Sequence, residues 1–176
     1  MLFDVTASET SPLSLSEQDV AALAACGRGT ILFDVAARAD ATLIALTGTN
    51  GRITLSLRAG RLDGEQVLGA VGRPEGPSGA GSESGIQRRV LDAEDALGLD
   101  DGRPHTIAVT VNETGTHLYA DGYECFSTTL AAFLAQIGLT EVRIDPDGIA
   151  TVTRLAAWDE PLSDRAVMAQ SLAATP

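Results

Sequence analysis

The chain has 176 residues, enough for one domain with a substantial two-layer core. Its formal net charge is −12, from 24 acidic residues against 12 basic ones, and every basic residue is arginine. This charge repels phosphate backbones and anionic lipid, so we expect no nucleic-acid or membrane partner, and an anionic ligand would need a local pocket of arginines.

The first patterned segment is a short helix. Ser16 with Asp19 three residues later forms a capping box, and an apolar stripe that includes Leu23 follows. Gly27 then ends the helix. The residues before it, starting Met1-Leu2-Phe3-Asp4, lack the charged and apolar regions of a signal peptide, so we expect any such segment to be absent from this sequence.

From Thr30 onward the pattern changes to the two-residue period of strands. Asn50-Gly51 is a strong hairpin signal because both residues tolerate a positive φ, and Ala59-Gly60 marks a second turn. Gly72–Gly85 is rich in glycine, proline and serine and is predicted to be a flexible loop. The strands predicted in this half are Thr30–Val35, Ala41–Thr47, Arg52–Arg58 and Arg61–Ala70.

The second half continues as short strands, with helices predicted over Thr128–Ile137 and from Pro161 or Ser163 to Leu172. Many short strands with helices only at the margins favour an antiparallel sandwich, here a single domain over residues 1–176. The strands predicted in this half are Ile86–Leu91, His105–Val111, Thr116–Ala120, Tyr123–Ser127, Thr140–Ile144 and Ile149–Trp158.

Three stretches resemble the laminin-G-like family. His105–Val111 reads His-Thr-Ile-Ala-Val-Thr-Val and Thr114–Gly122 reads Thr-Gly-Thr-His-Leu-Tyr-Ala-Asp-Gly. In the family, a strand that begins Trp-His-Thr-Val precedes a Leu-Tyr-Val-Asp/Asn-Gly hairpin. Leu155–Asp164, Leu-Ala-Ala-Trp-Asp-Glu-Pro-Leu-Ser-Asp, is similar to the family's closing strand.

Ser14–Val20, Gly29–Phe33 and Phe133–Thr140 resemble more specifically the N-terminal domain of bacterial sialidases. With the other stretches they cover nearly the whole chain in the expected order. The resemblance implies a concanavalin-A-like, laminin-G-like antiparallel β-sandwich of jelly-roll type with short peripheral helices. It also implies a secreted or cell-surface module that binds sugar, usually a terminal sialic acid, beside a separate catalytic propeller.

The resemblance assigns ligand residues only in part. Glu65 matches the acid of the family's Glu-x-Arg pair, but Val67 stands where the arginine would be. Arg143 lies near a late arginine of the family, whereas Asp145–Gly148, a good turn sequence, occupies the expected loop. Pro104 replaces the tryptophan that usually precedes His105.

An acidic sugar also requires a guanidinium that can pair bidentately with its carboxylate. Tyr119 and Tyr123 could add flat surfaces and hydroxyl groups for a sugar ring. The arginine candidates are Arg58, Arg61, Arg88, Arg89, Arg143 and Arg154. The ligand-binding set that we predict is Glu65, Arg58, Arg61, Arg143, Tyr119 and Tyr123.

Nothing in the sequence predicts catalysis. The Asp-box motifs of the sialidase propeller do not occur, and the chain is too short for a propeller. His105 and His117 could approach each other across a hairpin and bind a metal, but ordinary strand positions are favoured because no cysteine or carboxylate has the matching spacing. Cys26 and Cys125 could form one disulfide or remain separate buried thiols.

Acidic clusters offer one further possibility, because laminin-G-like domains sometimes bind calcium. The clusters in this chain do not have the ordered spacing of an EF-hand loop, so we interpret them as solvent-facing turns and expect no cofactor. They are Asp92-Glu94-Asp95, Asp100-Asp101 and Asp145-Asp147.

The leading hypothesis is a non-catalytic module that binds sialylated glycans and holds an associated sialidase catalytic domain near its substrate. Two alternatives remain: a structural module without a working sugar site, and a protein-binding laminin-G-like domain that uses calcium. An exposed apolar patch would favour either alternative.

Overall fold

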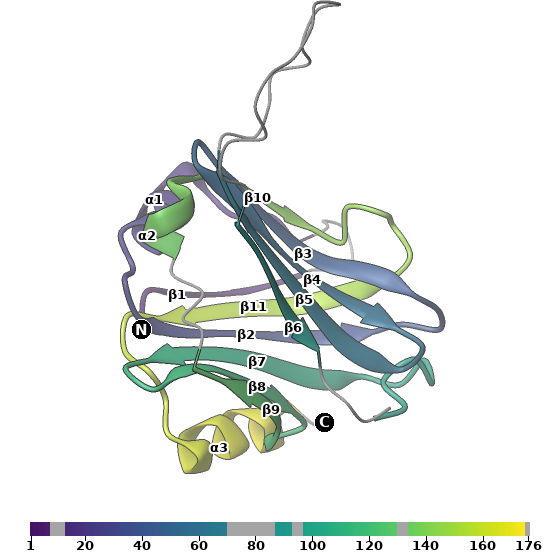
Figure 1. The fold of residues 1–176 in the computed structure, drawn as a ribbon. Helices are drawn as coiled ribbons and strands as arrows, with labels where there is room; N and C mark the ends of the chain where they lie inside the picture. The colour runs from purple at the N-terminus through teal and green to yellow at the C-terminus, as the bar shows by residue number, and fades with distance from the viewer. Residues whose placement is uncertain (8–12, 70–86, 93–96, 130–133, 175–176) are drawn as a thin grey trace, which may run out of the picture.

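The computed structural model describes residues 1–7, 13–69, 87–92, 97–129 and 134–174 (Figure 1). The loop predicted at 72–85 lies outside the described residues. The elements in chain order are β1 (Phe3–Thr6), α1 (Glu17–Ala24), β2 (Gly29–Ala36), β3 (Ala41–Gly48), β4 (Gly51–Arg58), β5 (Arg61–Leu68), β6 (Gln87–Asp92), β7 (His105–Asn112), β8 (Gly115–Ala120), β9 (Tyr123–Thr128), α2 (Leu134–Ile137), β10 (Leu139–Ile144), β11 (Thr151–Trp158) and α3 (Asp164–Ala174).

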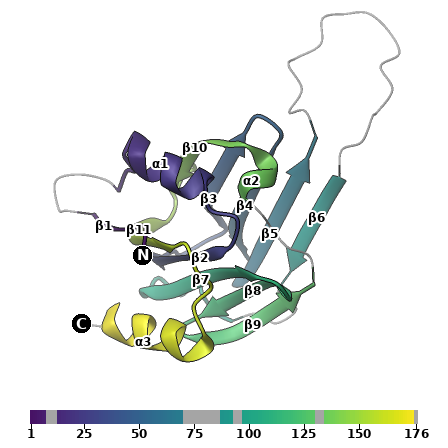
Figure 2. The same cartoon turned by 90° about the vertical axis from the view of Figure 1, so that its left-hand side faces the viewer.

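The strands form two antiparallel sheets that face each other, which confirms the predicted sandwich (Figures 1 and 2). One sheet has six strands in the order β1-β11-β2-β7-β8-β9, and the other has five in the order β10-β3-β4-β5-β6. Helices α1 and α2 lie together at one end of the sandwich, where Leu23 and Ile137 enter the core.

The main core fills the space between the sheets. Alternate residues of each strand point inward, as the pleat requires, so Leu57 and Leu62 on neighbouring strands are both fully buried. Phe33, Ile107 and Leu118 meet them from the six-stranded sheet. Each such side chain contributes about 1.5–3 kcal/mol when it is removed from water, so this layer stabilises the sandwich as a whole.

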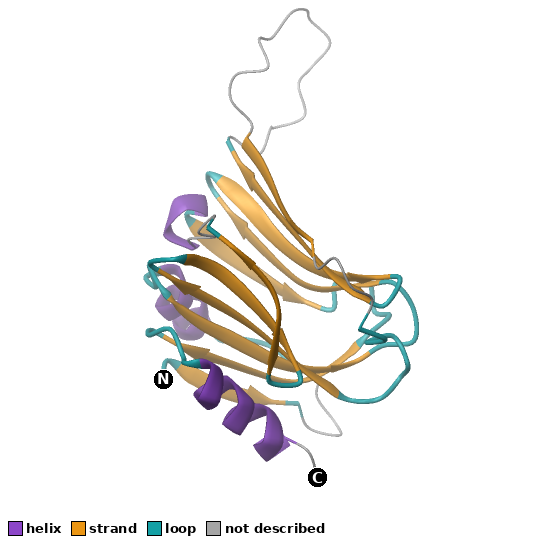
Figure 3. Ribbon diagram, turned by 60° about the horizontal axis from the view of Figure 1, so that its bottom comes forward, coloured by secondary structure: helices purple, strands orange, loops and turns teal. Residues whose placement is uncertain are grey.

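The six-stranded sheet is buried on its other side as well. Helix α3 lies across that side and buries Val167 against Tyr119 and Trp158, in a second apolar cluster with Leu32 and Ala156. The five-stranded sheet differs, because none of the described helices lies over its outer side (Figures 2 and 3). The outer side of the five-stranded sheet is therefore not covered by any helix in the described ranges, whereas the outer side of the six-stranded sheet is covered by α3.

Most predicted strands match the observed ones to within two residues. Strand β1 was not predicted; it has only four residues, which pair with the end of β11. The helix predicted over Thr128–Ile137 is wrong at its start, because Thr128 belongs to β9. Residues 130–133 lie outside the described residues, and the observed helix α2 covers Leu134–Ile137.

The hairpin predicted at Asn50-Gly51 exists, but its turn residues are Thr49 and Asn50. Gly51 pairs with Gly48 and begins β4, without a positive φ. A Cβ atom at Gly51 would lie 2.2 Å from the carbonyl oxygen of Val67, so close approach of β5 is what requires a glycine at this position.

The capping box predicted for α1 is confirmed. The Ser16 side chain accepts a hydrogen bond from the Asp19 backbone N–H at 3.2 Å, and the Ser16 N–H donates to the Asp19 carboxylate at 3.1 Å. Two N–H groups that the first turn would otherwise leave unpaired are thereby satisfied. None of the helices in the described ranges is long and apolar enough to cross a bilayer.

We predict that Ser16→Ala lowers the free energy of unfolding by about 1 kcal/mol, because the side-chain half of this capping box is lost. Urea denaturation followed by circular dichroism measures the change. Ser14→Ala is the matched control, since Ser14 is exposed just before the helix. An equal loss in the two variants would contradict the assignment of Ser16 as the cap.

Candidate functional site

The β4–β5 hairpin arranges the polar residues of the five-stranded sheet. Its two-residue turn consists of Ala59 and Gly60, with φ of 51° and 73°, as the predicted turn requires. The turn pairs Arg58 with Arg61, and the register continues to Thr54 opposite Glu65 and Arg52 opposite Val67. Since the intervening residues point into the core, these side chains are directed to the solvent side.

We call this solvent side of β10, β3, β4 and β5 the outer face. Small side chains occupy its middle and charged ones surround them. Its residues are Glu141 and Arg143 on β10, Ala45 and Thr47 on β3, Arg52, Thr54, Ser56 and Arg58 on β4, and Arg61, Asp63, Glu65 and Val67 on β5.

One cross-strand row of the outer face joins two of the predicted ligand residues. The register places Arg143 opposite Ala45, Ala45 opposite Thr54, and Thr54 opposite Glu65. Three strand spacings separate the ends of the row, or about 14 Å at about 4.8 Å each. Because only Ala45 and Thr54 lie between, the row is a flat strip with a cation at one end and an anion at the other.

Ion pairs organise the charges of the outer face. The Arg58 Nε lies 3.3 Å from the Asp63 carboxylate, and the Arg143 Nε donates to Glu141 at 2.9 Å. Arg52 Nη2 lies 3.9 Å from Glu65 Oε2. Counted over the residues defined above, the face carries four arginines against three carboxylates, although the whole chain carries −12. Among these residues the arginines exceed the carboxylates by one, so the face is less acidic than the chain as a whole.

The structure brings together four of the six predicted ligand residues: Glu65, Arg58, Arg61 and Arg143 all lie on the outer face. Neither tyrosine does. Tyr119 is only 3% exposed beneath α3, where its hydroxyl donates to Asp164 at 2.9 Å. Burial, with the Asp164 carboxylate beside it, raises the pKa of Tyr119 above its ordinary value. Tyr123 is 70% exposed at the start of the edge strand β9 of the other sheet.

The remaining arginine candidates have different positions. Arg88 and Arg89 pair through their backbones with Val67 and Gln66, and their side chains are outside the described part of the structure. Arg154 is committed elsewhere, because it donates two hydrogen bonds to Asp4, at 2.8 and 2.9 Å. These bonds lower the pKa of the Asp4 carboxyl and fasten β1 to β11.

Sequence reasoning missed Arg52, which lies on the outer face beside Glu65. A signal was present: a two-residue turn at Ala59-Gly60 fixes the pairing of every residue in the hairpin, and that pairing places Arg52 opposite Val67. The arginine that the family pattern lacks at position 67 thus has a counterpart on the neighbouring strand.

The histidines and cysteines lie apart from one another. His117 contacts Glu124 and Thr114, whereas His105 lies between Asp101 and Asp121. Over the part of the chain that the structure describes, no cluster of three or more His, Cys, Asp or Glu residues could hold a metal ion. Cys26 and Cys125 are separate free thiols. Burial raises the pKa of both, that of Cys125 to about 11, so neither is an activated nucleophile at neutral pH.

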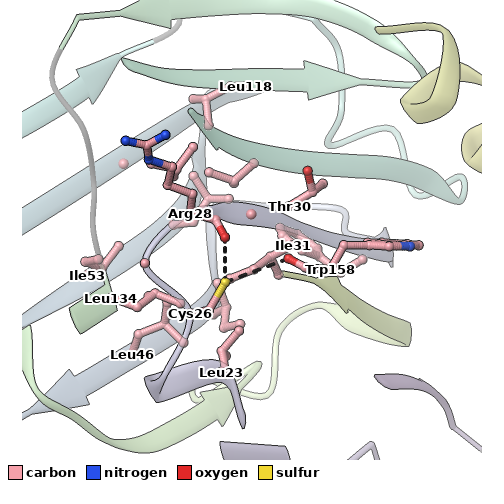
Figure 4. A pocket seen from close by; sticks show the side chains of 18 of the residues that line it. Leu23, Cys26, Arg28, Thr30, Ile31, Leu46, Ile53, Leu118, Leu134 and Trp158 are labelled. Carbon is pink, nitrogen blue, oxygen red and sulfur yellow. Dashed lines mark hydrogen bonds between the residues drawn. The ribbon is translucent and has the colours of Figure 1, made fainter. Parts of the chain in front are cut away.

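An apolar cavity lies between the two sheets near α1 (Figure 4). Its walls include Leu23, Ile53, Leu118 and Leu134, and the Cys26 thiol at its edge donates to the carbonyl of Arg28 at 2.7 Å. A glycan needs convergent hydrogen-bonding groups for its hydroxyls, and this lining supplies few. Of this cavity and the outer face, the outer face is therefore the better candidate for a sugar site.

No protein-family model matches the chain, and no curated protein matches its sequence. Solved structures do resemble it. The CBM40 of the Ruminococcus gnavus IT-sialidase, bound to α2,6-sialyllactose, has a TM-score of 0.63 at 17% identity, with 97% of this chain and 98% of that chain covered. The sequence-based resemblance to sialidase-associated carbohydrate-binding domains is thus confirmed at the level of the fold.

Two further structures have the same fold within longer chains. The leech intramolecular trans-sialidase, complexed with 2,7-anhydro-Neu5Ac, has a TM-score of 0.62 at 16% identity, with 98% of this chain but 27% of that chain covered. The binding domain of botulinum neurotoxin DC in complex with SialylT has a TM-score of 0.56 at 12% identity, with 97% and 39% covered.

We predict that His105 stabilises the protein at low pH and that this stabilisation decreases as the pH rises above 6.5. Burial opposes the charged imidazole, but hydrogen bonds with Asp121 at 2.8 Å and Asp101 at 3.1 Å outweigh it and raise the pKa of His105 above 6.5. The folded state therefore holds this proton more tightly than the unfolded state. The stabilisation is complete below pH 6.5 and is lost as the pH rises through the folded-state pKa.

Urea unfolding of the wild type and of His105→Gln at intervals from pH 5.5 to 8.5 measures this contribution. The difference in unfolding free energy between the two proteins should shrink as the pH rises. Arg103 and Asp34 also lie near His105, and both are present in the wild type and the variant, so the difference between the two proteins isolates the histidine. A difference that is constant with pH would contradict the prediction.

We predict that Tyr119→Phe lowers the unfolding free energy by about 1 kcal/mol, the usual value of one hydrogen bond, because the bond to Asp164 is lost. Glycan binding should be unchanged, since Tyr119 lies beneath α3 and not on the outer face. Urea unfolding and glycan titration of the same preparation measure both quantities. If Tyr119→Phe loses glycan affinity but keeps its stability, the prediction is wrong and Tyr119 belongs to the ligand site.

Proposed function

We propose that the protein is a non-catalytic module that binds sialylated glycans on its outer face. The observation that carries the proposal is the placement of Glu65, Arg143 and the other outer-face arginines on the sheet surface that no described helix covers. A sialic acid presents a carboxylate, for which a guanidinium is the matching partner, and hydroxyl and amide groups that pair with carboxylates and threonine hydroxyls.

The structural neighbours support the same ligand class. The R. gnavus CBM40 is described in complex with both α2,6- and α2,3-sialyllactose, and the toxin domain in complex with SialylT. These proteins share 12–17% of their residues with this chain, so the likeness supports the fold and the choice of glycans to test. The site itself is inferred from the residues of the outer face.

We further propose that the module is secreted or held at the cell surface and targets an associated sialidase catalytic domain. In the leech trans-sialidase the matched region is about a quarter of the chain, which supports such an arrangement. Tethering would let a weak lectin act, because the linked catalytic domain then meets its substrate at a high effective concentration.

Saturation-transfer NMR with α2,3- and α2,6-sialyllactose, lactose and a neutral glycan panel, with and without calcium, tests the proposed function. Saturation of the sialic acid protons alone is the expected result, and lactose should show none. If no sugar in the panel receives saturation transfer, the proposed function is wrong.

We predict that Glu65→Gln weakens sialyllactose binding about tenfold, because a charged acceptor for sugar hydroxyl or amide groups becomes neutral. Isothermal titration or NMR titration measures the change. Glu160→Gln is the matched control, since Glu160 is exposed after β11 on the other sheet. Equal affinities of the two variants would remove Glu65 from the site.

One observation favours the second candidate, a structural or protein-binding module. Tyr123, Met168 and Leu172 are exposed, and Met168 packs close to Gly122, the neighbour of Tyr123, with Leu172 one turn further along α3. An apolar patch of this kind fits a protein partner such as an adjoining domain. The glycan panel separates the candidates, because this function predicts no transfer to any sugar.

A further inference from the structure

We propose that Arg52 on β4 binds the carboxylate of the terminal sialic acid. The inference rests on the proposed function and deepens it by naming the residue that recognises the acidic group. Arg52 is opposite Val67 in the β4–β5 register, and its Nη2 atom lies 3.9 Å from Glu65 Oε2. The guanidinium thus comes from β4, one strand away from Val67, and remains beside the same acid.

The guanidinium of Arg52 is oriented but uncommitted. A separation of 3.9 Å from Glu65 is an electrostatic contact and is too long for a hydrogen bond. No other described residue accepts a hydrogen bond from Arg52, and its side chain is 52% exposed. Its N–H donors are therefore available as a planar fork to a ligand carboxylate, while Glu65 limits the positions that the fork can take.

Two of the other arginines on the outer face are less suitable because their Nε groups are engaged. The Nε of Arg143 donates to Glu141 at 2.9 Å, and that of Arg58 lies 3.3 Å from Asp63. Using the Nε edge of either fork for a ligand would require breaking or sharing an existing ion pair.

Arg61 has no ion-pair or hydrogen-bond partner among the residues that the structure describes, but its surroundings are different. It lies at the last pair of the hairpin, directly opposite Arg58 and next to the Ala59-Gly60 turn. Small side chains do not flank it on both neighbouring strands, so a sugar ring bound there would have little surface to rest on.

Arg52 has such a surface. Its cross-strand neighbours are Thr47 on β3 and Val67 on β5, and Thr54 and Ala45 form the next row toward Arg143. A pyranose ring can therefore lie against short side chains with its carboxylate directed to Arg52. Glu65 and the threonine hydroxyls would accept from or donate to the remaining polar groups of the sugar.

The test compares Arg52→Ala with Arg165→Ala, a matched loss of one exposed arginine from α3, which packs on the other sheet. Isothermal titration of each with α2,6-sialyllactose should show at least a tenfold loss of affinity for Arg52→Ala and less than a twofold change for Arg165→Ala. Urea unfolding of both variants checks that the fold is retained.

The methyl ester of the sialic acid tests the role of the carboxylate. Esterification should weaken binding to the wild type about as much as Arg52→Ala does, and it should have little further effect on the variant. If esterification weakens binding to Arg52→Ala by the same factor as it weakens binding to the wild type, the carboxylate and Arg52 do not interact, and the assignment is wrong.

The double variant Arg52→Val/Val67→Arg moves the guanidinium across the pair and rebuilds a Glu-x-Arg sequence on β5. Binding well above that of Arg52→Val alone supports the assignment, and affinity no better than Arg52→Val contradicts it. If the wild type and Arg52→Ala bind sialyllactose equally well, this inference is wrong and the proposed function still stands. A wild type that binds no sialoside overturns both.

Discussion

The candidate site depends on the register of the β4–β5 hairpin. With Ala59 and Gly60 both at positive φ, the turn allows one pairing of the two strands, which puts Leu57 opposite Leu62 in the core. The same pairing puts Arg52, Thr54 and Glu65 on the solvent side. A slip of one residue would move the leucines into water and the charges into the core, at a cost of several kcal/mol for the apolar side chains alone. The core thus fixes the positions of the candidate ligand residues although it lies on the opposite side of the sheet.

Helix α3 imposes the complementary constraint. By covering the six-stranded sheet it converts a surface that carries Tyr119 and Trp158 into a second core. The sandwich is therefore unequal: one sheet is buried on both sides, and the other keeps an outer side on which polar residues can be arranged without loss of core. Arg154 strengthens this arrangement, since it fastens β1 through Asp4 and also donates to Gln170 of α3.

Local signals in the sequence were sufficient for strands β2 to β11, the capping box at Ser16 and the turn at Ala59-Gly60, because period, caps and turn chemistry act over a few residues. That turn also implied the position of Arg52, through register alone. The positions of Tyr119 and His105 could not be inferred, because they depend on α3, Asp101 and Asp121, which distant packing brings together. Strand β1 is too short to show a period, and its pairing with β11 is a contact between the two ends of the chain.

The strong negative charge of the chain bears on how an anionic glycan could bind. At physiological salt a charge acts over about 8 Å, so the −12 of the whole molecule is largely screened and the groups nearest the ligand dominate. On the outer face each carboxylate lies beside an arginine, so a ligand carboxylate meets ion pairs and not isolated anions. Recognition then depends on which guanidinium can turn its donors to the ligand without losing a hydrogen bond. By that criterion a 3.9 Å contact such as that of Arg52 with Glu65 suits ligand binding better than an ion pair at hydrogen-bond distance. The longer contact orients the cation and leaves its donors free.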